Sequence, residues 1–336
     1  MSETVPSGPA RGLSIVIPNW NGIKMLGACL ESVTHAYKVA GYRQPWDVII
    51  ADDGSTDGSV DWLRERYPWV RLALGQERSG FIANANRGIE LCRQPYFLLL
   101  NNDVTLHEEF LTQWQDAYSD SETFSVTPLM LRPDGVTFDS GRRVGVWDHG
   151  LIRHWVVCNR GVSSPALYGS GGASIYETEK FRRLGGLDPL FRPMYMEDFD
   201  VSYRAWKRGW KTIYQPACLA YHHGSVSSKQ VYRERQLSGI IAKNHYLFIW
   251  KNITDPVLFQ QHVAWLPFWL GQAWRPGRRI VSAGFVTALR QFREALALRT
   301  RERREERVSD RTIWRWFEPT PEDLANSPYQ GWAGTA

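Results

Sequence analysis

The residues best suited to chemistry in this chain are polar side chains that directly follow apolar runs. Residues 96–100 form one such run, which is preceded by Pro95 and followed by Asn101, Asn102 and Asp103. The pattern predicts a buried strand whose end presents these side chains at a sheet edge, where open α/β sheets bind ligands. Asp103 could hold Mg²⁺ or Mn²⁺ there, because these ions take few protein oxygens and complete their shell with substrate phosphates and water. The alternative is an ordinary Asn/Asp turn after a strand.

A second acidic pair, Asp52 and Asp53, follows the apolar run 48–51. Acidic groups at this place suit a ligand with hydroxyl and amide donors, such as the ribose and pyrimidine of a nucleotide, while a metal ion at Asp103 would neutralise its diphosphate. The first turn, residues 19–22, has neither the Gly-x-Gly-x-x-Gly of a dinucleotide fold nor a P-loop. The sequence therefore favours a nucleotide other than NAD or ATP.

A third acidic cluster contains Glu197, Asp198 and Asp200, next to the aromatic residues Tyr195 and Phe199. Aromatic neighbours can desolvate a carboxylate and raise its basicity, which suits a general base. The same acids are also typical of a helix N-terminus, where they favour the helix dipole, and both interpretations can hold together.

His222 and His223 end a later apolar segment. A lone histidine is more often a packed or surface residue than a ligand, but imidazole is also a common metal partner.

Strands alternate with helices in the part of the chain that carries the first two acidic clusters. Strands are expected at residues 13–18, 48–51, 70–74 and 96–100, and helices around 25–37, 60–67 and 82–92. This alternation predicts a doubly wound, mostly parallel α/β sheet with helices on both faces, in which Asp52, Asp53 and Asp103 gather at the carboxyl ends of strands.

Composition narrows the class of protein. The chain has 336 residues, 43% of them hydrophobic, which suffices for one large α/β core with appendages. The formal charge of +5 is modest, so nucleic-acid binding is not expected. The four cysteines are far apart, which argues against a zinc site or disulfide framework and fits a reducing cytoplasm. Residues 1–11 lack an apolar signal core, and no apolar run reaches the roughly 20 residues that span a bilayer.

With these motifs in order, the chain resembles the family 2 inverting glycosyltransferases, which have the GT-A fold, and among them the bacterial rhamnosyltransferase-like enzymes. The resemblance extends from about residue 13 to residue 250. The matching segments are residues 17–22, 51–58, 80–88, 100–103, 184–191, 195–200 and 204–210.

The resemblance implies a role for each matching position. The donor would contact Pro18, Asn19, Asn21, Asp52, Asp53, Asn86 and Asn102. Asp103 and His222, with His223 in reserve, would bind Mg²⁺ or Mn²⁺. Asp198 would be the base, and Gly171, Gly172, Glu197 and Trp210 would lie on the acceptor side. One departure is that Asn101 replaces the first acid of the family's usual Asp-x-Asp, which leaves the metal site one negative charge short.

The C-terminal part supports two interpretations. Val281, Phe285, Leu289, Phe292 and Leu296 share one helical face beside several arginines. An amphipathic helix of this kind can lie on a membrane, and the contact would run through residues 263–299. Alternatively, the face packs on the catalytic domain or on a second subunit.

The resulting interpretation is a metal-dependent, inverting glycosyltransferase. It would move a sugar, with rhamnose favoured, from a dTDP- or UDP-linked donor to a hydroxyl of a glycan or polyprenyl-linked acceptor during surface polysaccharide assembly. The expected parts are a disordered N-terminus (1–11), a GT-A domain (12–252), a helical extension (253–317) and a poorly ordered tail (318–336). The expected location is the cytoplasm or the inner face of the membrane, and a homodimer is left open. The alternatives are a nucleotidyltransferase and a non-catalytic nucleotide-sugar-binding module.

Overall fold

The computed structural model describes residues 11–43, 46–224, 232–271, 279–325, 327 and 329–330. The disordered N-terminus expected over residues 1–11 lies outside the described residues except for Arg11. Residues 272–278, within the expected membrane segment, also lie outside them.

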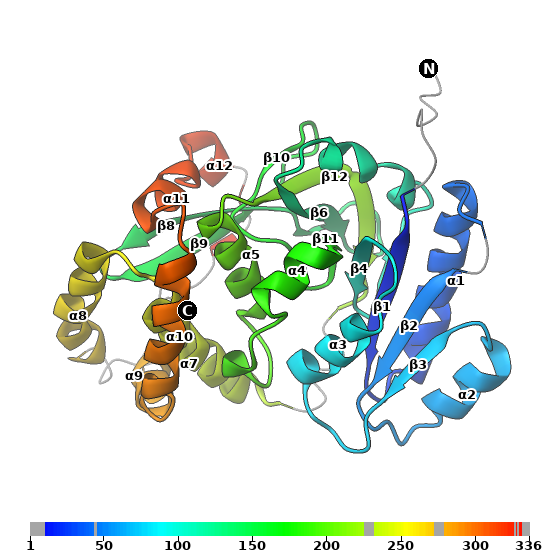
Figure 1. The fold of residues 1–336 in the computed structure, drawn as a ribbon, viewed down its shortest axis with the longest axis horizontal. Coiled ribbons are helices and arrows are strands. Elements are labelled where there is room, and N and C mark those ends of the chain that lie inside the picture. The colour runs from blue at the N-terminus through cyan, green and yellow to red at the C-terminus, as the bar shows by residue number, and fades with distance from the viewer. Residues whose placement is uncertain are drawn as a thin grey trace.

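A twisted ten-stranded sheet forms the centre of the molecule, with strand order β10-β12-β6-β11-β4-β1-β2-β3 and with β5 and β7 on its margin (Figure 1). Its strands are β1 (Leu13–Asn19), β2 (Asp47–Asp52), β3 (Arg71–Leu74), β4 (Tyr96–Leu100), β5 (Val104–Leu106), β6 (Thr123–Leu131), β7 (Phe138–Ser140), β10 (Ser164–Pro165), β11 (Ala173–Glu177) and β12 (Lys211–His222). The pairs β1–β2, β1–β4, β2–β3 and β6–β12 are parallel, whereas β11 runs antiparallel to both β4 and β6. The predicted mostly parallel α/β sheet is confirmed.

Helices cover both faces of this sheet. They are α1 (Ile23–Val39), α2 (Ser59–Arg66), α3 (Phe81–Glu90), α4 (Thr178–Leu184) and α5 (Glu197–Lys207), with short 3-10 helices η1 (Phe110–Thr112), η2 (Gln115–Ser119) and η3 (Pro189–Phe191). Alternate side chains of β1 point to opposite faces, so Ile15 and Ile17 join the core under α1 while Val16 joins the core under α3. Gly88 of α3 lies so close to the sheet that a Cβ atom there would come within 2.6 Å of Val16 Cγ1. Helix α3 therefore packs directly against β1 and β2.

A second, three-stranded sheet stands beside the first and is formed by β8 (Arg142–Asp148), β9 (Leu151–Val157) and β13 (Tyr329–Gln330). Strand β13 pairs with β9, and the helix α12 (Pro321–Ala325) precedes it. Arg142 of β8 pairs with Asp323 of α12 at 2.8 Å. Helix α12 and strand β13 thus attach the described part of residues 318–336 to the second sheet.

The C-terminal helices pack on the body that contains the large sheet through α7 (Glu234–Asn252). They are α8 (Pro256–Gly271), α9 (Arg279–Leu289), α10 (Phe292–Glu305) and α11 (Asp310–Trp316). In Figure 1, α9 and α10 lie alongside α7 at the end of the molecule away from β3. The rings of Phe285 and Phe292 stand edge-on to Trp250 of α7, with centroids 5.8 and 5.0 Å apart. Two of the five residues assigned to the membrane-facing side therefore contact the core, as the second interpretation of that helical face expected.

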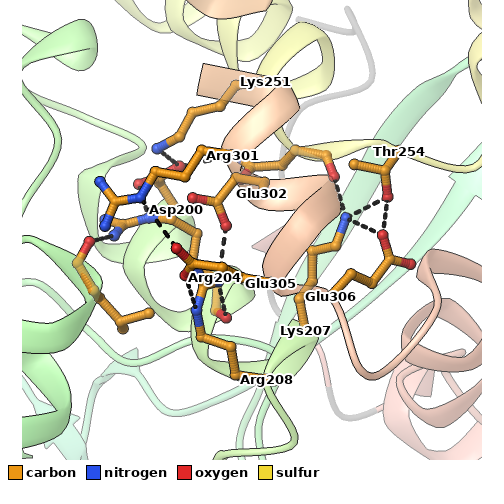
Figure 2. Close-up of polar contacts among 12 residues, drawn as sticks. Asp200, Arg204, Lys207, Arg208, Lys251, Thr254, Arg301, Glu302, Glu305 and Glu306 are labelled. Carbon is orange, nitrogen blue, oxygen red and sulfur yellow. Dashed lines mark hydrogen bonds and ion pairs between the residues drawn. The ribbon is translucent and has the colours of Figure 1, made fainter. Parts of the chain in front are cut away.

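A buried network of charges joins α5 to these C-terminal helices (Figure 2). Asp200 accepts hydrogen bonds from Arg204 and from Lys251 of α7, both at 2.7 Å. Further along α5, Lys207 lies 3.2 Å from both Glu306 and Asp310, and Arg208 pairs with Glu302 at 2.8 Å and with Glu305. Because charges cut off from water need partners, α5 and the C-terminal helices are tied together as one body.

Candidate active site

A cavity of about 360 Å³ opens at the carboxyl ends of the central strands. Its walls come from the ends of β1, β4 and β12, the loop before α3, the turn before β11 and the N-terminus of α5. Ten of the sequence-predicted site residues line it: Pro18, Asn19, Asp53, Asn102, Asp103, Gly171, Gly172, Glu197, Asp198 and His222. The fold therefore brings together residues that are up to 204 positions apart in the chain, since both Pro18 and His222 line the cavity.

The wall formed by β1 and β4 contains a chain of side-chain hydrogen bonds. Asn102 Nδ2 donates to Asn19 Oδ1, and Asn19 Nδ2 donates to Asp52 Oδ2, both at 2.8 Å. Asp52 also accepts from the backbone N–H of Ser55 at 2.8 Å and from its hydroxyl at 2.6 Å. The carboxylate of Asp52 is thus buried behind Asn19 and orients it.

Asp53 holds the loop in front of α3. Its Oδ1 accepts from the N–H of Ser79 at 2.8 Å, and its Oδ2 accepts from the N–H of Gly80 at 2.8 Å. Gly80 has a φ of 89°, a conformation that side chains disfavour, so glycine is needed for this loop to fold back onto Asp53. In the loop, the guanidinium carbon of Arg78 lies 4.2 Å from the ring centroid of Trp20, and both residues line the cavity.

A row of polar contacts connects the ends of β4 and β12. His222 Nε2 lies 3.5 Å from Asp103 Oδ2, and His222 Nδ1 lies 2.8 Å from Asp139 Oδ2. Arg132 in turn pairs with Asp139 at 2.6 Å. Burial disfavours the imidazolium, but the hydrogen bonds to Asp103 and Asp139 outweigh it and raise the pKa of His222 to about 9.

Asp103 and His222 fit a divalent cation, to which they would supply two protein ligands. No group of three or more His, Cys, Asp or Glu side chains in the described part of the chain is arranged to hold a metal ion. One carboxylate and one imidazole suffice where substrate phosphates supply further oxygens. Asp139 on the far nitrogen of His222 is the kind of second partner that orients metal-binding histidines. A metal ion at His222 Nε2 would have to replace the proton there.

Asp198 and Glu197 begin helix α5, which enters the cavity through an unusual turn. Tyr195 and Met196 have positive φ angles of 71° and 72°, a conformation that costs free energy for residues other than glycine. The side-chain amide of Asn244, from α7, lies 2.8–2.9 Å from the carbonyl oxygens of Phe191, Met194 and Tyr195 and so supports this turn.

The two carboxylates have different surroundings. Asp198 Oδ2 accepts from the N–H of Gly171 at 3.1 Å, and its Oδ1 accepts from the N–H of Phe199 at 2.8 Å. Glu197 is 7% exposed and its Oε2 has no hydrogen-bond partner.

Burial determines the protonation of this pair. Burial, together with the charge of Asp198, raises the pKa of Glu197 to about 8. Burial also raises the pKa of Asp198, but Arg143 and the N–H groups of Phe199 and Gly171 act against that rise. The surroundings therefore favour a proton on Glu197 rather than on Asp198.

Four sequence-predicted site residues do not line the cavity. Asn21 links two loops by accepting from the N–H of Thr56 at 2.8 Å, and Asp52 lies behind Asn19. Asn86 bonds both to the carbonyl and to the N–H of Leu187, at 2.7 and 3.0 Å. Trp210 packs beneath the guanidinium of Arg183 at 5.2 Å.

Other residues at the cavity were not identified from the sequence. These are Arg78, Asp139, Ser140 and Arg143 at its lining and Asn244 behind the turn. Residues 138–143 carry no family motif, and Asn244 lies in an ordinary amphipathic helix pattern. The sequence did offer one signal, the adjacent arginines 142 and 143 in a strand. Because successive side chains of a strand point to opposite faces, one of the two had to point toward the interior.

This chain is similar to a known protein family and to a curated relative. The family model described as Glycosyl transferase family 2 matches residues 14–185. An N-acetylglucosaminyl-diphospho-decaprenol L-rhamnosyltransferase of Mycobacterium tuberculosis is 28% identical over 229 residues, which cover 60% of this chain and 74% of that protein.

Solved structures share the fold. The crystal structure of GalNAc-T7 with UDP, GalNAc and Mn²⁺ superposes with a TM-score of 0.59 at 19% identity, over 87% of this chain and 55% of that one. The mannosyltransferase PcManGT from Pyrobaculum calidifontis, in complex with GDP-Man and Mn²⁺, gives a TM-score of 0.52 at 14% identity, over 88% of this chain and 86% of that one.

Proposed function

Since this chain belongs to glycosyl transferase family 2 and is a glycosyltransferase, we propose that it transfers one sugar, with inversion and with help from a divalent metal, from a nucleotide-diphosphate donor to an acceptor hydroxyl. The observation that carries the proposal is that one cavity contains both the Asp103–His222 pair and the half-buried carboxylate Asp198. Family membership decides against the nucleotidyltransferase alternative.

The donor is proposed to lie along the ends of β1, β2 and β4. Asn19, Asp53 and Asn102 line the cavity and would contact the nucleotide, while Asp52, Asn21 and Asn86 hold the loops that carry these contacts. Asp103 and His222 would hold Mg²⁺ or Mn²⁺. This ion, when bound, would neutralise the negative charge that develops on the departing diphosphate.

Asp198 is proposed to accept the proton of the acceptor hydroxyl. As that oxygen forms its bond to the anomeric carbon, the bond from this carbon to the diphosphate oxygen breaks on the opposite side, and the configuration inverts. The raised pKa of Asp198 suits this role, because a stronger base removes the proton more readily.

Rhamnose from a dTDP- or UDP-linked donor is the proposed sugar, and a lipid-linked glycan of the cell envelope is the proposed acceptor. The similarity to the mycobacterial rhamnosyltransferase supports both.

No helix in the described ranges is long and apolar enough to cross a membrane. We propose that the enzyme works in the cytoplasm and touches the membrane through exposed apolar side chains of α8 and α9, namely Val263, Phe268 and Val286, which are 52, 50 and 61% exposed.

A thermal-shift panel of nucleotide sugars, each with and without Mn²⁺, tests the proposed donor. A ligand that binds only the folded protein stabilises it by about 2.7 kcal/mol at a hundred times its dissociation constant, so donors can be ranked. The proposal expects the largest shift with a dTDP- or UDP-sugar and Mn²⁺ together. Unchanged melting with every donor would contradict it.

A further inference from the structure

Two arginines line the cavity, Arg78 and Arg143, and neither forms an ion pair with a carboxylate among the residues that the structure describes. Arg143 belongs to β8, in the smaller sheet. Its neighbour Arg142 makes an ion pair with Asp323 and donates from Nε to the carbonyl of Pro165 at 3.1 Å, outside the cavity lining. Successive side chains of a strand alternate, so the strand places one arginine in a salt bridge and the other in the cavity.

The guanidinium of Arg143 is held in place but keeps unused donors. Its Nη2 donates to Ser140 Oγ at 3.0 Å, and its carbon lies 5.0 Å from the ring centroid of Tyr168. Its Nε is buried without a hydrogen-bond partner. An arginine has five N–H donors, and a buried donor that finds no partner costs free energy. The guanidinium of Arg143 therefore keeps N–H donors that a bound anion could accept from.

The position of Arg143 indicates which substrate brings this anion. The proposed place for the donor diphosphate is beside Asp103 and His222, at the ends of β4 and β12. Arg143 enters from the other sheet, and its charge acts on Asp198, the proposed base. The acceptor hydroxyl must lie at Asp198 during transfer, which brings the acceptor within the influence of this cation.

We propose that Arg143 forms an anion subsite for the acceptor, where it binds a phosphate or diphosphate ester that the acceptor carries close to the attacked hydroxyl. The inference rests on the proposed function and specifies the class of acceptor. A guanidinium matches phosphate oxygens with two parallel hydrogen bonds, which would also fix the sugar ring relative to Asp198.

The test compares acceptors that carry the same sugar on different anomeric groups: a short-chain lipid diphosphate, a 1-phosphate without lipid, and a neutral alkyl glycoside. For the unmodified enzyme, KM should be about tenfold or more lower for both phosphorylated acceptors than for the neutral one, as expected for one charged hydrogen-bonding group. A low KM for the lipid diphosphate alone would assign the preference to the lipid chain and overturn the inference.

Substitutions then assign the effect to the residue. Arg143→Met should raise KM for the phosphorylated acceptors to the value for the neutral one, so that the difference between the acceptors disappears. Arg143→Lys keeps the charge but loses the two parallel N–H donors, and it should restore part of the difference in KM between phosphorylated and neutral acceptors. Arg142→Met is the matched control, with the same charge change on the same strand, and should keep the full difference. If Arg143→Met does not fold, Arg143→Lys and the acceptor series of the unmodified enzyme decide the question.

The rival explanation is that Arg143 serves only to keep Asp198 ionised. In that case Arg143→Met would lower kcat equally for all three acceptors and move the acidic limb of the pH profile to higher pH, which overturns the inference while leaving the proposed function intact. Donor binding and slow donor hydrolysis by the unmodified enzyme check the proposed function separately. Their absence with every nucleotide sugar would overturn both.

Discussion

At the scale of single residues, neighbouring carboxylates in the cavity are distinguished by their surroundings. Asp198 has two backbone N–H donors, whereas Glu197 has one oxygen without any partner. Hydrogen bonds to the charged form favour ionisation, and burial without them opposes it. Glu197 and Asp198 are therefore adjacent in sequence but differ in how readily they ionise in the folded protein.

Asp198→Asn should lower turnover by about a hundredfold or more, because the amide cannot take the acceptor proton. Donor affinity should stay close to that of the unmodified protein, since the base acts on the acceptor alone. Steady-state kinetics and donor titration measure the two quantities. A variant that keeps more than about a tenth of the turnover would remove Asp198 from this role.

Asp103→Ala should affect the donor first. The variant removes the only carboxylate of the proposed metal pair, so donor binding should weaken and lose its response to Mn²⁺. Isothermal titration with and without Mn²⁺ measures this. Asp139→Asn serves as a comparison, because it leaves Asp103 in place and disturbs only the partner of His222 Nδ1. An unchanged Mn²⁺ response in Asp103→Ala would place the metal elsewhere.

Glu197 should make stability depend on pH. Its pKa is raised from 4.5 to about 8 in the folded protein, so the folded state holds its proton more tightly than the unfolded state. The free energy of unfolding must then fall as pH rises from about 4.5 to about 8, and the loss is complete above that range. Glu197→Gln cannot ionise and should gain stability relative to the unmodified protein across this window. Melting temperatures at pH 5 and pH 8 test it, and a difference between the two proteins that is independent of pH would contradict it.

At the scale of elements, helix α5 carries the proposed base at one end and the buried ion network along its length. Lys251 is 1% exposed on its side chain and pairs with Asp188 and Asp200, both at 2.7 Å. Lys251→Met leaves these acids without that cation and should lower the free energy of unfolding by about 3–5 kcal/mol. Lys211→Met, which breaks exposed pairs with Asp120 and Glu122, should cost no more than about 1 kcal/mol. Urea titration compares them, and equal losses would mean that burial of the network does not matter.

The loops that line the cavity are held in place by residues from other helices and strands. The strained turn before α5 is held by Asn244 of α7, and the loop before α3 is held by Asp53 after β2. Each of these residues supports a backbone conformation that another segment presents to the cavity. The precision of the site therefore rests on contacts between elements that are far apart in sequence.

At the scale of the whole molecule, the C-terminal helices form part of the folded body. A chain that ends at Asn252 would lose Glu306 and Asp310, partners of Lys207, and Glu302 and Glu305, partners of Arg208. It would also uncover Trp250. We expect this shortened chain to be insoluble or to lack a cooperative melting transition, whereas a chain that ends at residue 325 should melt cooperatively. A soluble, cooperative 252-residue chain that binds donor would contradict this and favour a separate membrane segment.

The sequence by itself determined the α/β core and the family. Apolar runs such as residues 13–17 and 96–100 form strands because their side chains are buried on both faces of a parallel sheet, a local pattern that is legible without the fold. Polar residues directly after those strands had to meet at one edge, which placed Asn19, Asp53 and Asp103 in one cavity.

Only the tertiary structure decided which side chains face that cavity and which support it. Asp52 and Asn86 belong to the same motifs as their neighbours, yet their hydrogen bonds turn them toward the protein. Arg143 lies in a segment without a motif, and it reaches the cavity because a second sheet stands beside the first. The apolar face of the C-terminal helices packs on α7. A helical wheel shows which side of a helix is apolar, but the surface that this side packs against is known only from the fold.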